Sequence, residues 1–271
     1  YTITMNFIII DGSYFIFYRY HALRIWWGLA KKEDETNDYC ENQRFIDKFR
    51  ETFVTKINEM TQKLNIDDKT IIFVGKDCPR KEVWRNTHID NYKGTRNNSD
   101  TNIKKLFEIA YGENLFIKAG AKLILSYPKL EADDCVAITA KHIVETQENS
   151  KVWIITSDMD YLQLASERIK LYDLKYKDLT NSKNSFNDAQ KDLFCKIVTG
   201  DKSDNIPSVL PKCGIKTAVK FYNNKELFED RLNITDGARE RYERNKLIID
   251  FDRIPIELIN DFKETNEFLK F

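Results

Sequence analysis

Seven carboxylates fall into three short motifs of this chain, and their spacing points to metal chemistry. They are Glu131, Asp133 and Asp134, then Asp158 and Asp160, and finally Asp201 and Asp204. Like charges gathered at the ends of core elements repel one another unless a cation lies among them. The sequence therefore predicts a site for divalent metal ions.

Short apolar runs precede several acids and predict the strands of an open α/β sheet. The runs 6–10, 70–74 and 151–156 are rich in β-branched residues and are followed by Asp11, by Asp77, and by Asp158 with Asp160. Ligands of α/β sheets bind at the carboxyl ends of strands. Amphipathic helices are expected over about 131–146, which carries the first motif, and over 45–64, which covers the sheet. All the acids are expected to face one cleft.

The ligand type narrows the choice of metal. Carboxylate oxygens suit hard cations such as Mg²⁺ or Mn²⁺ rather than zinc. The acids are more numerous than one ion needs, which favours two ions about 3.5–4 Å apart, as used for in-line phosphoryl displacement. A phosphate ester is the expected substrate.

Taken in order, these motifs resemble those of the 5′-nuclease superfamily, which includes flap endonucleases, 5′-to-3′ exonucleases and phage enzymes that remove RNA primers. The matching segments, spread over roughly residues 6–225, are Asp11-Gly12, Asp77, EADD at 131–134, SDMDYLQL at 157–164 and GDKSDNIP at 200–207. The resemblance implies a PIN-like α/β fold, with a central, mostly parallel sheet flanked by helices. It places a nuclease core at 1–185, with a helical arch at about 80–110. A helical DNA-binding region would follow at 186–271, with a helix-three-turn-helix at about 195–225.

The same resemblance implies how the acids share two metal ions. Asp77, Glu131 and Asp133 would hold the first ion, with Asp11 acting through water. The second ion would be held by Asp158, Asp160 and either Asp201 or Asp204, and Asp133 or Asp134 would bridge. One ion would activate water and the other would stabilise the leaving 3′ oxygen, giving a 5′-phosphate and a 3′-hydroxyl.

A basic segment at 80–105 resembles the arch of that superfamily. Between Lys76 and Lys105 there are eight Lys or Arg residues against four acids. Low hydrophobic content and Gly94 predict that the segment lies outside the core. The resemblance implies a catalytic role at the scissile phosphate for Lys93 and Arg96. The residues expected to bind nucleic acid here are Arg80, Trp84, Arg85, Tyr92, Lys93 and Arg96, with Trp84 and Tyr92 stacking on unpaired bases. The alternative is a passive, solvated loop.

A second basic segment, 202–225, has five lysines and a single acid, Asp204. Its part 209–218 resembles the hairpin of a helix-three-turn-helix, which holds duplex phosphates on backbone N–H groups and a helix N-terminus. The residues implied to bind are Lys212, Gly214, Lys216, Thr217 and Lys220, and a monovalent ion would bind at the hairpin. The usual pattern, G-I-G-x-K-T-A, has two glycines, but only Gly214 is present here, so a plain helix N-terminus stays an alternative.

Composition agrees with an enzyme that works inside the cell. The 271 residues include 43 Lys plus Arg and 43 Asp plus Glu, so the formal net charge is zero. The charge is segregated, however, and two basic segments flank an acidic cleft, which allows a polyanionic partner. Five cysteines without a C-x-x-C pair predict free thiols in a reducing compartment. No apolar run suggests a membrane span or a signal peptide.

The sequence thus predicts a structure-specific, metal-dependent 5′ nuclease of DNA replication and repair. Its substrates would be DNA with a 5′ flap, nick or overhang, and RNA primers in RNA–DNA hybrids. We expect a monomer that works at sites of DNA replication, including those of a virus-infected host cell, with replication proteins as partners. Two alternatives stay open: a PIN-type ribonuclease that cuts single-stranded RNA, and a non-catalytic protein that binds DNA junctions.

Overall fold

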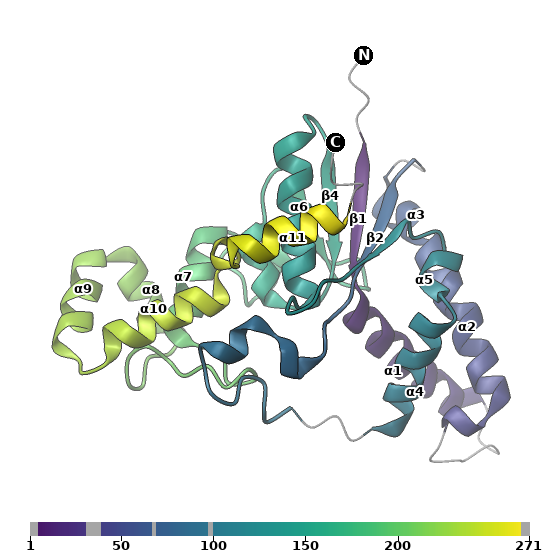
Figure 1. The fold of residues 1–271 in the computed structure, drawn as a ribbon, viewed down its shortest axis with the longest axis horizontal. Helices are drawn as coiled ribbons and strands as arrows, with labels where there is room; N and C mark the ends of the chain where they lie inside the picture. Colours follow the sequence, from purple (N-terminus) through teal and green to yellow (C-terminus); the bar gives the residue numbers. More distant parts are fainter. Residues whose placement is uncertain (1–4, 31–38, 67–68, 97–99, 267–271) are drawn as a thin grey trace.

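Five short parallel strands form one sheet at the centre of the computed structural model, which describes residues 5–30, 39–66, 69–96 and 100–266 (Figure 1). The strands are β1 (Asn6–Asp11), β2 (Ile71–Gly75), β3 (Leu123–Leu125), β4 (Lys151–Ile155) and β5 (Ile169–Tyr172). Their order across the sheet is β3-β2-β1-β4-β5, and every neighbouring pair is parallel. All five carboxyl ends therefore lie at one edge.

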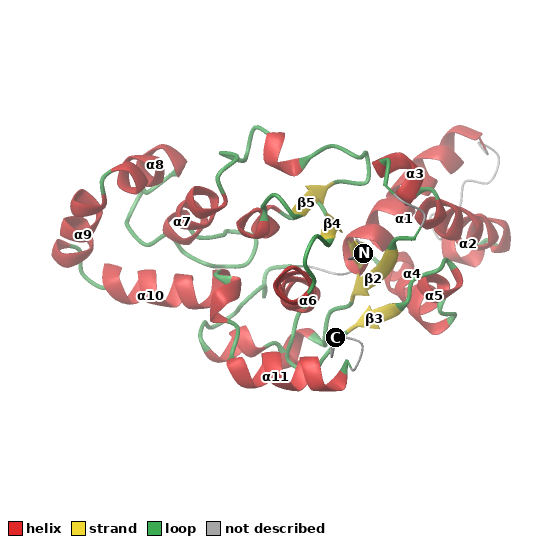
Figure 2. Cartoon of the chain, turned by 90° about the horizontal axis from the view of Figure 1, so that it is seen from above, coloured by secondary structure: helices red, strands yellow, loops and turns green. Residues whose placement is uncertain are grey.

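Alternate residues of β1 face two separate hydrophobic cores, as expected of a strand buried on both sides. Phe7 and Ile9 belong to one core, and Ile8 and Ile10 belong to the other. The first core is closed by α6 (Ala132–Thr146) and α11 (Ile256–Thr265). The second is closed by α1 (Gly12–Ala30), α2 (Gln43–Asn58), α3 (Met60–Leu64), α4 (Thr101–Gly112) and α5 (Leu115–Lys118). Figure 2 shows the sheet between these two layers of helices.

A group of helices to one side of the sheet has a core of its own. It comprises α7 (Ala189–Thr199), α8 (Ile215–Asn223), α9 (Lys225–Ile234) and α10 (Ala238–Ile249). Phe194, Phe221 and Phe228 pack together at its centre. The chain then returns to the sheet, because Phe262 of α11 lies in the core that contains Phe7. A domain boundary at residue 185 stays a prediction.

The predicted fold class is confirmed, and so are the three predicted strands and the helix of the first acidic motif. The predicted helix 45–64 is two helices, α2 and α3, that meet at Glu59. Strands β3 and β5 were not predicted. Short 3-10 helices cover Tyr39–Glu41, Arg80–Glu82, Trp84–Thr87, Met159–Leu164, Leu179–Asn181 and Phe251–Arg253. Within the described ranges, no helix has the length and apolar character needed to cross a membrane.

Candidate metal centre and nucleic-acid interface

The strand ends bring acids from distant parts of the chain to one edge of the sheet. Asp11 is the last residue of β1, and Asp77 and Asp158 follow β2 and β4 by two and three residues. Thr156 Oγ1 donates to Asp11 Oδ2 over 3.1 Å. Ser13 Oγ donates to Asp77 Oδ2 over 2.5 Å. These hydrogen bonds hold the acids in place at the edge.

Helix α6 begins against the same edge. The backbone N–H of Ala132 donates to Asp77 Oδ1 over 2.9 Å, so the first turn of α6 is tied to the end of β2. Asp134 Oδ2 accepts the backbone N–H of Glu131 over 3.1 Å, which caps the helix. The first motif therefore lies at a helix N-terminus, where the backbone favours negative charge.

Two groups of carboxylates have oxygens within 4.8 Å of one another: Glu131, Asp133 and Asp134 in one, and Asp160, Asp201 and Asp204 in the other. We call the two groups, together with Asp11, Asp77 and Asp158, the acidic rim. Glu131, Asp134 and Asp204 are buried, whereas Asp77 and Asp158 are exposed. The exact sharing of these acids between two ions stays a prediction.

Three cationic side chains lie among the acids. Lys93 Nζ is 2.5 Å from Glu131 Oε1 and 3.7 Å from Asp204 Oδ2. Arg96 pairs with Asp204. On the other side, Lys196 Nζ of α7 lies 2.6 Å from an oxygen of Asp160 and 2.5 Å from an oxygen of Asp201. The arch segment and α7 thus both contribute positive charge to the rim.

A fourth cation, Arg85, is buried beneath the rim with 2% of its surface exposed. Its Nη1 and Nη2 donate to the two oxygens of Asp134 over 2.7 and 2.6 Å, and Nη1 also donates to Glu131 over 3.0 Å. Its Nε donates to the backbone oxygen of Ile248 over 2.7 Å. This two-pronged pair is the geometry that fits a guanidinium to a carboxylate. Asp134 is therefore already neutralised by the protein.

The rim still carries more negative charge than these cations neutralise. Burial, with the charges of Asp77 and Asp158, raises the pKa of Asp11 to about 7. Burial, with the charge of Asp158, raises the pKa of Asp160 to about 6 despite Lys196. Burial also raises the pKa of Asp133 well above its ordinary range. A cation bound among these groups would relieve each of them.

The donor set fits a hard divalent ion. Nine carboxylates surround the edge, and the nearest partly exposed thiol, Cys78, is a poor ligand, because burial with the charges of Glu131 and Asp77 raises its pKa to about 12. A thiol binds metal as the thiolate. All five cysteines are free, as predicted.

Part of the arch prediction was wrong. Trp84 and Tyr92 are buried, with 5% and 6% of their surfaces exposed, so neither is available to stack on bases. Trp84 Nε1 donates to Asp134 over 3.1 Å, and the Tyr92 hydroxyl donates to Glu131 over 3.0 Å. Arg85 is likewise engaged inside the protein and does not face a nucleic acid. Packing of Val83 and Ile89 also contradicts the prediction that this segment lies outside the core. Residues 97–99 of the segment lie outside the described residues.

Lys93 and Arg96 lie where a phosphate near the rim would meet them, and their role there stays a prediction. Arg80 is exposed, with Nη1 donating to the backbone oxygen of Arg96 over 3.1 Å. The basic segment 80–105 therefore contacts the rim through Lys93 and Arg96. Arg80 makes its hydrogen bond within the same segment.

The predicted hairpin is present even though its first glycine is missing. Lys212 stands at that glycine's place and takes the left-handed conformation, with φ of +55°. Cys213 N donates to Leu210 O over 3.2 Å, which closes the turn. Gly214 precedes α8, and a β-carbon added to it would meet no atom within 4 Å beyond its chain neighbours. The backbone start of α8 is thus accessible, and its role in binding a duplex stays a prediction.

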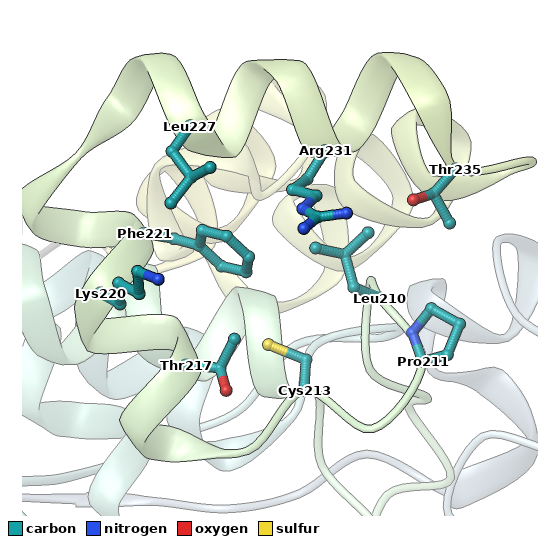
Figure 3. A pocket seen from close by; sticks show the side chains of 9 residues that line it. All are labelled: Leu210, Pro211, Cys213, Thr217, Lys220, Phe221, Leu227, Arg231 and Thr235. Carbon is teal, nitrogen blue, oxygen red and sulfur yellow. The ribbon is translucent and has the colours of Figure 1, made fainter.

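A pocket of about 300 Å³ separates the hairpin from α9 (Figure 3). It is lined by Leu210, Pro211, Cys213, Thr217, Lys220, Phe221, Leu227, Arg231 and Thr235. Two predicted nucleic-acid contacts, Thr217 and Lys220, line this pocket. Both are exposed, as is Lys216. Arg231 adds a cation that the sequence reasoning did not include.

Sequence reasoning also missed Lys196, Ser13 and Thr156 at the rim. The sequence offered a weak signal for Ser13 and Thr156, which stand two residues from Asp11 and Asp158. Lys196 stands five residues before Asp201 in a helix with one other lysine, Lys191, and nothing in its spacing marks it. Its position became visible only in the folded chain.

The chain is similar in sequence to known nucleases. The family model for the 5′-3′ exonuclease N-terminal resolvase-like domain matches residues 6–191. A 5′-3′ exonuclease of Buchnera aphidicola is 28% identical over 97% of this chain and 91% of its own length. Ribonuclease H of bacteriophage T4 is 30% identical over 49% of this chain and 47% of its own length.

Solved structures from bacteriophage T5 share the fold. A flap endonuclease in a pseudo-enzyme–product complex with DNA and metal ions has a TM-score of 0.67, and the match covers 98% of this chain and all of the other. A second T5 structure, co-crystallised with metal ions, has a TM-score of 0.69, and the match covers 97% of this chain and 99% of the other. Each is 19% identical to this chain, so the likeness concerns the fold.

Proposed function

The chain belongs to the 5′-3′ exonuclease family, and on that premise we propose that it is a metal-dependent 5′ nuclease that cleaves DNA at 5′ flaps and 5′ ends. The observation that carries the proposal is the acidic rim. Carboxylates from three strand ends, α6 and the loop after α7 converge at one edge, and burial raises the pKa values of Asp11, Asp133 and Asp160. A purely structural cluster would gain nothing from that repulsion.

Asp77, Glu131 and Asp133 would hold one divalent ion, and Asp158, Asp160 and Asp201 or Asp204 the other. Mg²⁺ is the proposed ion, with Mn²⁺ as a substitute, and the ions would supply an activated water and stabilise the leaving oxygen. Asp134 is proposed to hold Arg85 and the start of α6 rather than to bridge the ions, because both its oxygens accept from Arg85. No protein nucleophile is needed.

Lys93 and Arg96 are proposed to turn from the carboxylates to the phosphate when substrate binds. Both lie at the rim, and each already pairs with an acid that is proposed to hold an ion. A cation next to the reacting phosphate stabilises charge that develops in the transition state. These two side chains are therefore the proposed catalytic cations.

The duplex is proposed to bind at the hairpin and the start of α8. The left-handed turn at Lys212, the open surroundings of Gly214 and the exposed Lys216 support this, since duplex phosphates bind accessible helix N-termini and lysines. A monovalent ion at the hairpin is part of the same proposal.

Cleavage assays test the function. Asp158→Asn removes charge from an exposed acid, so we expect 5′-flap cleavage to fall by on the order of 10² or more while flap binding persists. EDTA should abolish cleavage by the unchanged protein. Asp252→Asn is the control, because that exposed acid pairs with Lys141 outside the rim. Near-normal turnover of Asp158→Asn at saturating Mg²⁺ would contradict the proposed metal site.

The substrate panel separates the remaining alternatives. The similarity to ribonuclease H of bacteriophage T4 supports an RNA primer on DNA as a second substrate. A 5′ flap, a nick, an overhang and an RNA-primed duplex should all be cut, with single-stranded RNA cut least. Preference for single-stranded RNA would favour a PIN-type ribonuclease, and binding without cleavage would favour a junction-binding protein. We further propose that the protein acts as a monomer inside the cell, together with replication proteins. The proposed setting includes virus-infected host cells.

A further inference from the structure

Two phenol hydroxyls in the described part of the chain are buried without a hydrogen-bond partner, those of Tyr111 and Tyr161. A buried donor without an acceptor costs stability, so each calls for an explanation. For Tyr111, close contacts fix the position of this oxygen. The Tyr111 hydroxyl lies 2.5 Å from the place that a β-carbon on Gly12 would take, and the backbone oxygen of Gly75 lies 2.6 Å from that place.

These neighbours place the hydroxyl near the two strand ends that carry Asp11 and Asp77. Gly12 directly follows Asp11, and Gly75 ends β2 just before Asp77. A side chain at position 12 would collide with this oxygen, so glycine there leaves room for the phenol. Tyr111 comes from α4, which overlaps the end of the basic segment 80–105, and it packs against the core on the side of the sheet opposite α6.

The ring of Tyr111 is fixed on several sides. Its centroid is 5.6 Å from that of Phe116 and 6.2 Å from that of Phe107. Lys76 Nζ lies 4.6 Å from the ring centroid, a cation–π distance. The hydroxyl therefore cannot swing to a distant partner. Burial, with the charges of Asp77 and Asp11, also raises the pKa of Tyr111 well above its ordinary value, so the phenol stays a donor.

The nearby carboxylates already have donors of their own. Asp11 accepts from Tyr14 N and Thr156 Oγ1, one on each oxygen. Asp77 accepts from Ser13 Oγ and Ala132 N, again one on each oxygen. Each of these oxygens can accept a second hydrogen bond, but none of them accepts one from the Tyr111 hydroxyl. The hydroxyl is therefore free to donate to something bound between the two acids.

We propose that the Tyr111 hydroxyl is a positioning group of the metal centre, donating a hydrogen bond to the oxygen shell of the ion that Asp77, Glu131 and Asp133 would hold, on the side where Asp11 lies. The inference rests on the proposed metal site and adds a residue outside the acidic motifs. Hydrogen bonds from outside the ligand set orient ligands and tune metal affinity, and their loss costs about 10- to 100-fold in affinity.

Tyr111→Phe tests this by removing one oxygen and keeping the ring. We expect the dissociation constant for Mn²⁺, measured by isothermal titration calorimetry, to rise about tenfold. In EDTA the melting temperature should equal or exceed that of the unchanged protein, because an unpartnered buried hydroxyl has been removed. Tyr242→Phe is the matched control on α10, and it should leave Mn²⁺ affinity unchanged.

Each result decides between the claims. Unchanged Mn²⁺ affinity in Tyr111→Phe overturns the role of Tyr111 and leaves the metal site standing. A lower melting temperature in EDTA also overturns it, because the hydroxyl would then have a partner within the protein. An unchanged protein that binds no Mn²⁺ overturns both the proposed metal site and the role of Tyr111.

Discussion

Arg85 shows how much of the rim depends on one buried side chain. Its guanidinium joins Asp134 of α6 and Glu131, which precedes α6, to the backbone of Ile248 in α10, over separations of 49, 46 and 163 positions. Removing one partner of a buried ion pair leaves an uncompensated charge, which costs more than the pair contributes. A buried side chain from outside the acidic motifs therefore supports two acids of the rim.

Arg85→Ala is therefore expected to destabilise the protein by about 3–5 kcal/mol, as measured by urea denaturation. Arg80→Ala in the same segment is the control. Arg80 is exposed, so its loss should change the free energy of unfolding by no more than about 0.5 kcal/mol. Equal stability of the two variants would mean that the buried pair contributes nothing.

Sequence reasoning found the acids of the rim but not their partners. Carboxylates next to apolar runs are visible because both features are local. Trp84, Arg85 and Tyr92 sit in a segment whose polar composition favours solvent, and their burial depends on Asp134 and Glu131, which lie 39–50 positions away. Local hydrophobicity carries no information about such pairing. Lys196 and Tyr111 were missed for the same reason.

At the scale of elements, length decided what could be predicted. β1, β2 and β4 have five or six residues and form the middle of the sheet, so their apolar runs stand out. β3 has three residues and β5 has four, and both are edge strands with partly exposed positions. Edge strands this short resemble loops in sequence. The helix of the first motif could be predicted because its helical pattern of apolar residues continues over 15 residues.

The hairpin and α8 form the element whose role can be tested separately. We expect a variant with Lys212→Gly, Lys216→Ala and Lys220→Ala to bind every duplex-containing substrate more weakly, with a salt dependence flatter by about 0.9 for each phosphate that the protein no longer neutralises. Glycine is chosen at 212 because the residue there is left-handed. KM should rise while kcat is preserved, the sign that uniform binding has weakened.

A control variant removes two lysines that lie away from the hairpin. Lys48 and Lys56 of α2 are partly exposed, and each already pairs with a nearby acid. Lys48→Ala with Lys56→Ala should leave both KM and the salt slope unchanged. If the hairpin variant also kept its salt slope, the duplex would be held elsewhere.

At the scale of the whole molecule, zero net charge conceals strong local fields. The rim concentrates negative charge at one edge of the sheet, and burial raises the pKa values of Asp11 to about 7 and Asp160 to about 6 from 3.8. Between about pH 4 and 7 the folded chain thus holds protons that the unfolded chain has released. The contribution of these two carboxyl groups to the free energy of unfolding therefore falls as the pH rises through that window.

We expect urea denaturation in EDTA to show this fall, by up to about 1.4 kcal/mol per pH unit for each carboxyl group. Saturating Mg²⁺ should remove most of this loss of stability, because the ion compensates the same negative charges. Asp11→Asn should flatten the slope in EDTA, whereas Asp252→Asn should not. Asp201 affects the pH dependence of stability only below this window. Burial would raise the pKa of Asp201, but hydrogen bonds from Lys196 and Ser203 lower it to about 2. A flat curve in EDTA would refute the claim of uncompensated charge.

The bond from Arg85 to Ile248 also sets an order of events during translation. The acceptor is made 163 residues after the donor, which at ~5–20 residues per second takes the ribosome ~8–30 s. The partners of Gln163 are also synthesised late, because its side chain donates to Ile249 O over 3.0 Å and accepts from Phe251 N over 2.8 Å. A nascent chain halted before residue 248 therefore carries every acid of the rim and still lacks the carbonyl that orients Arg85.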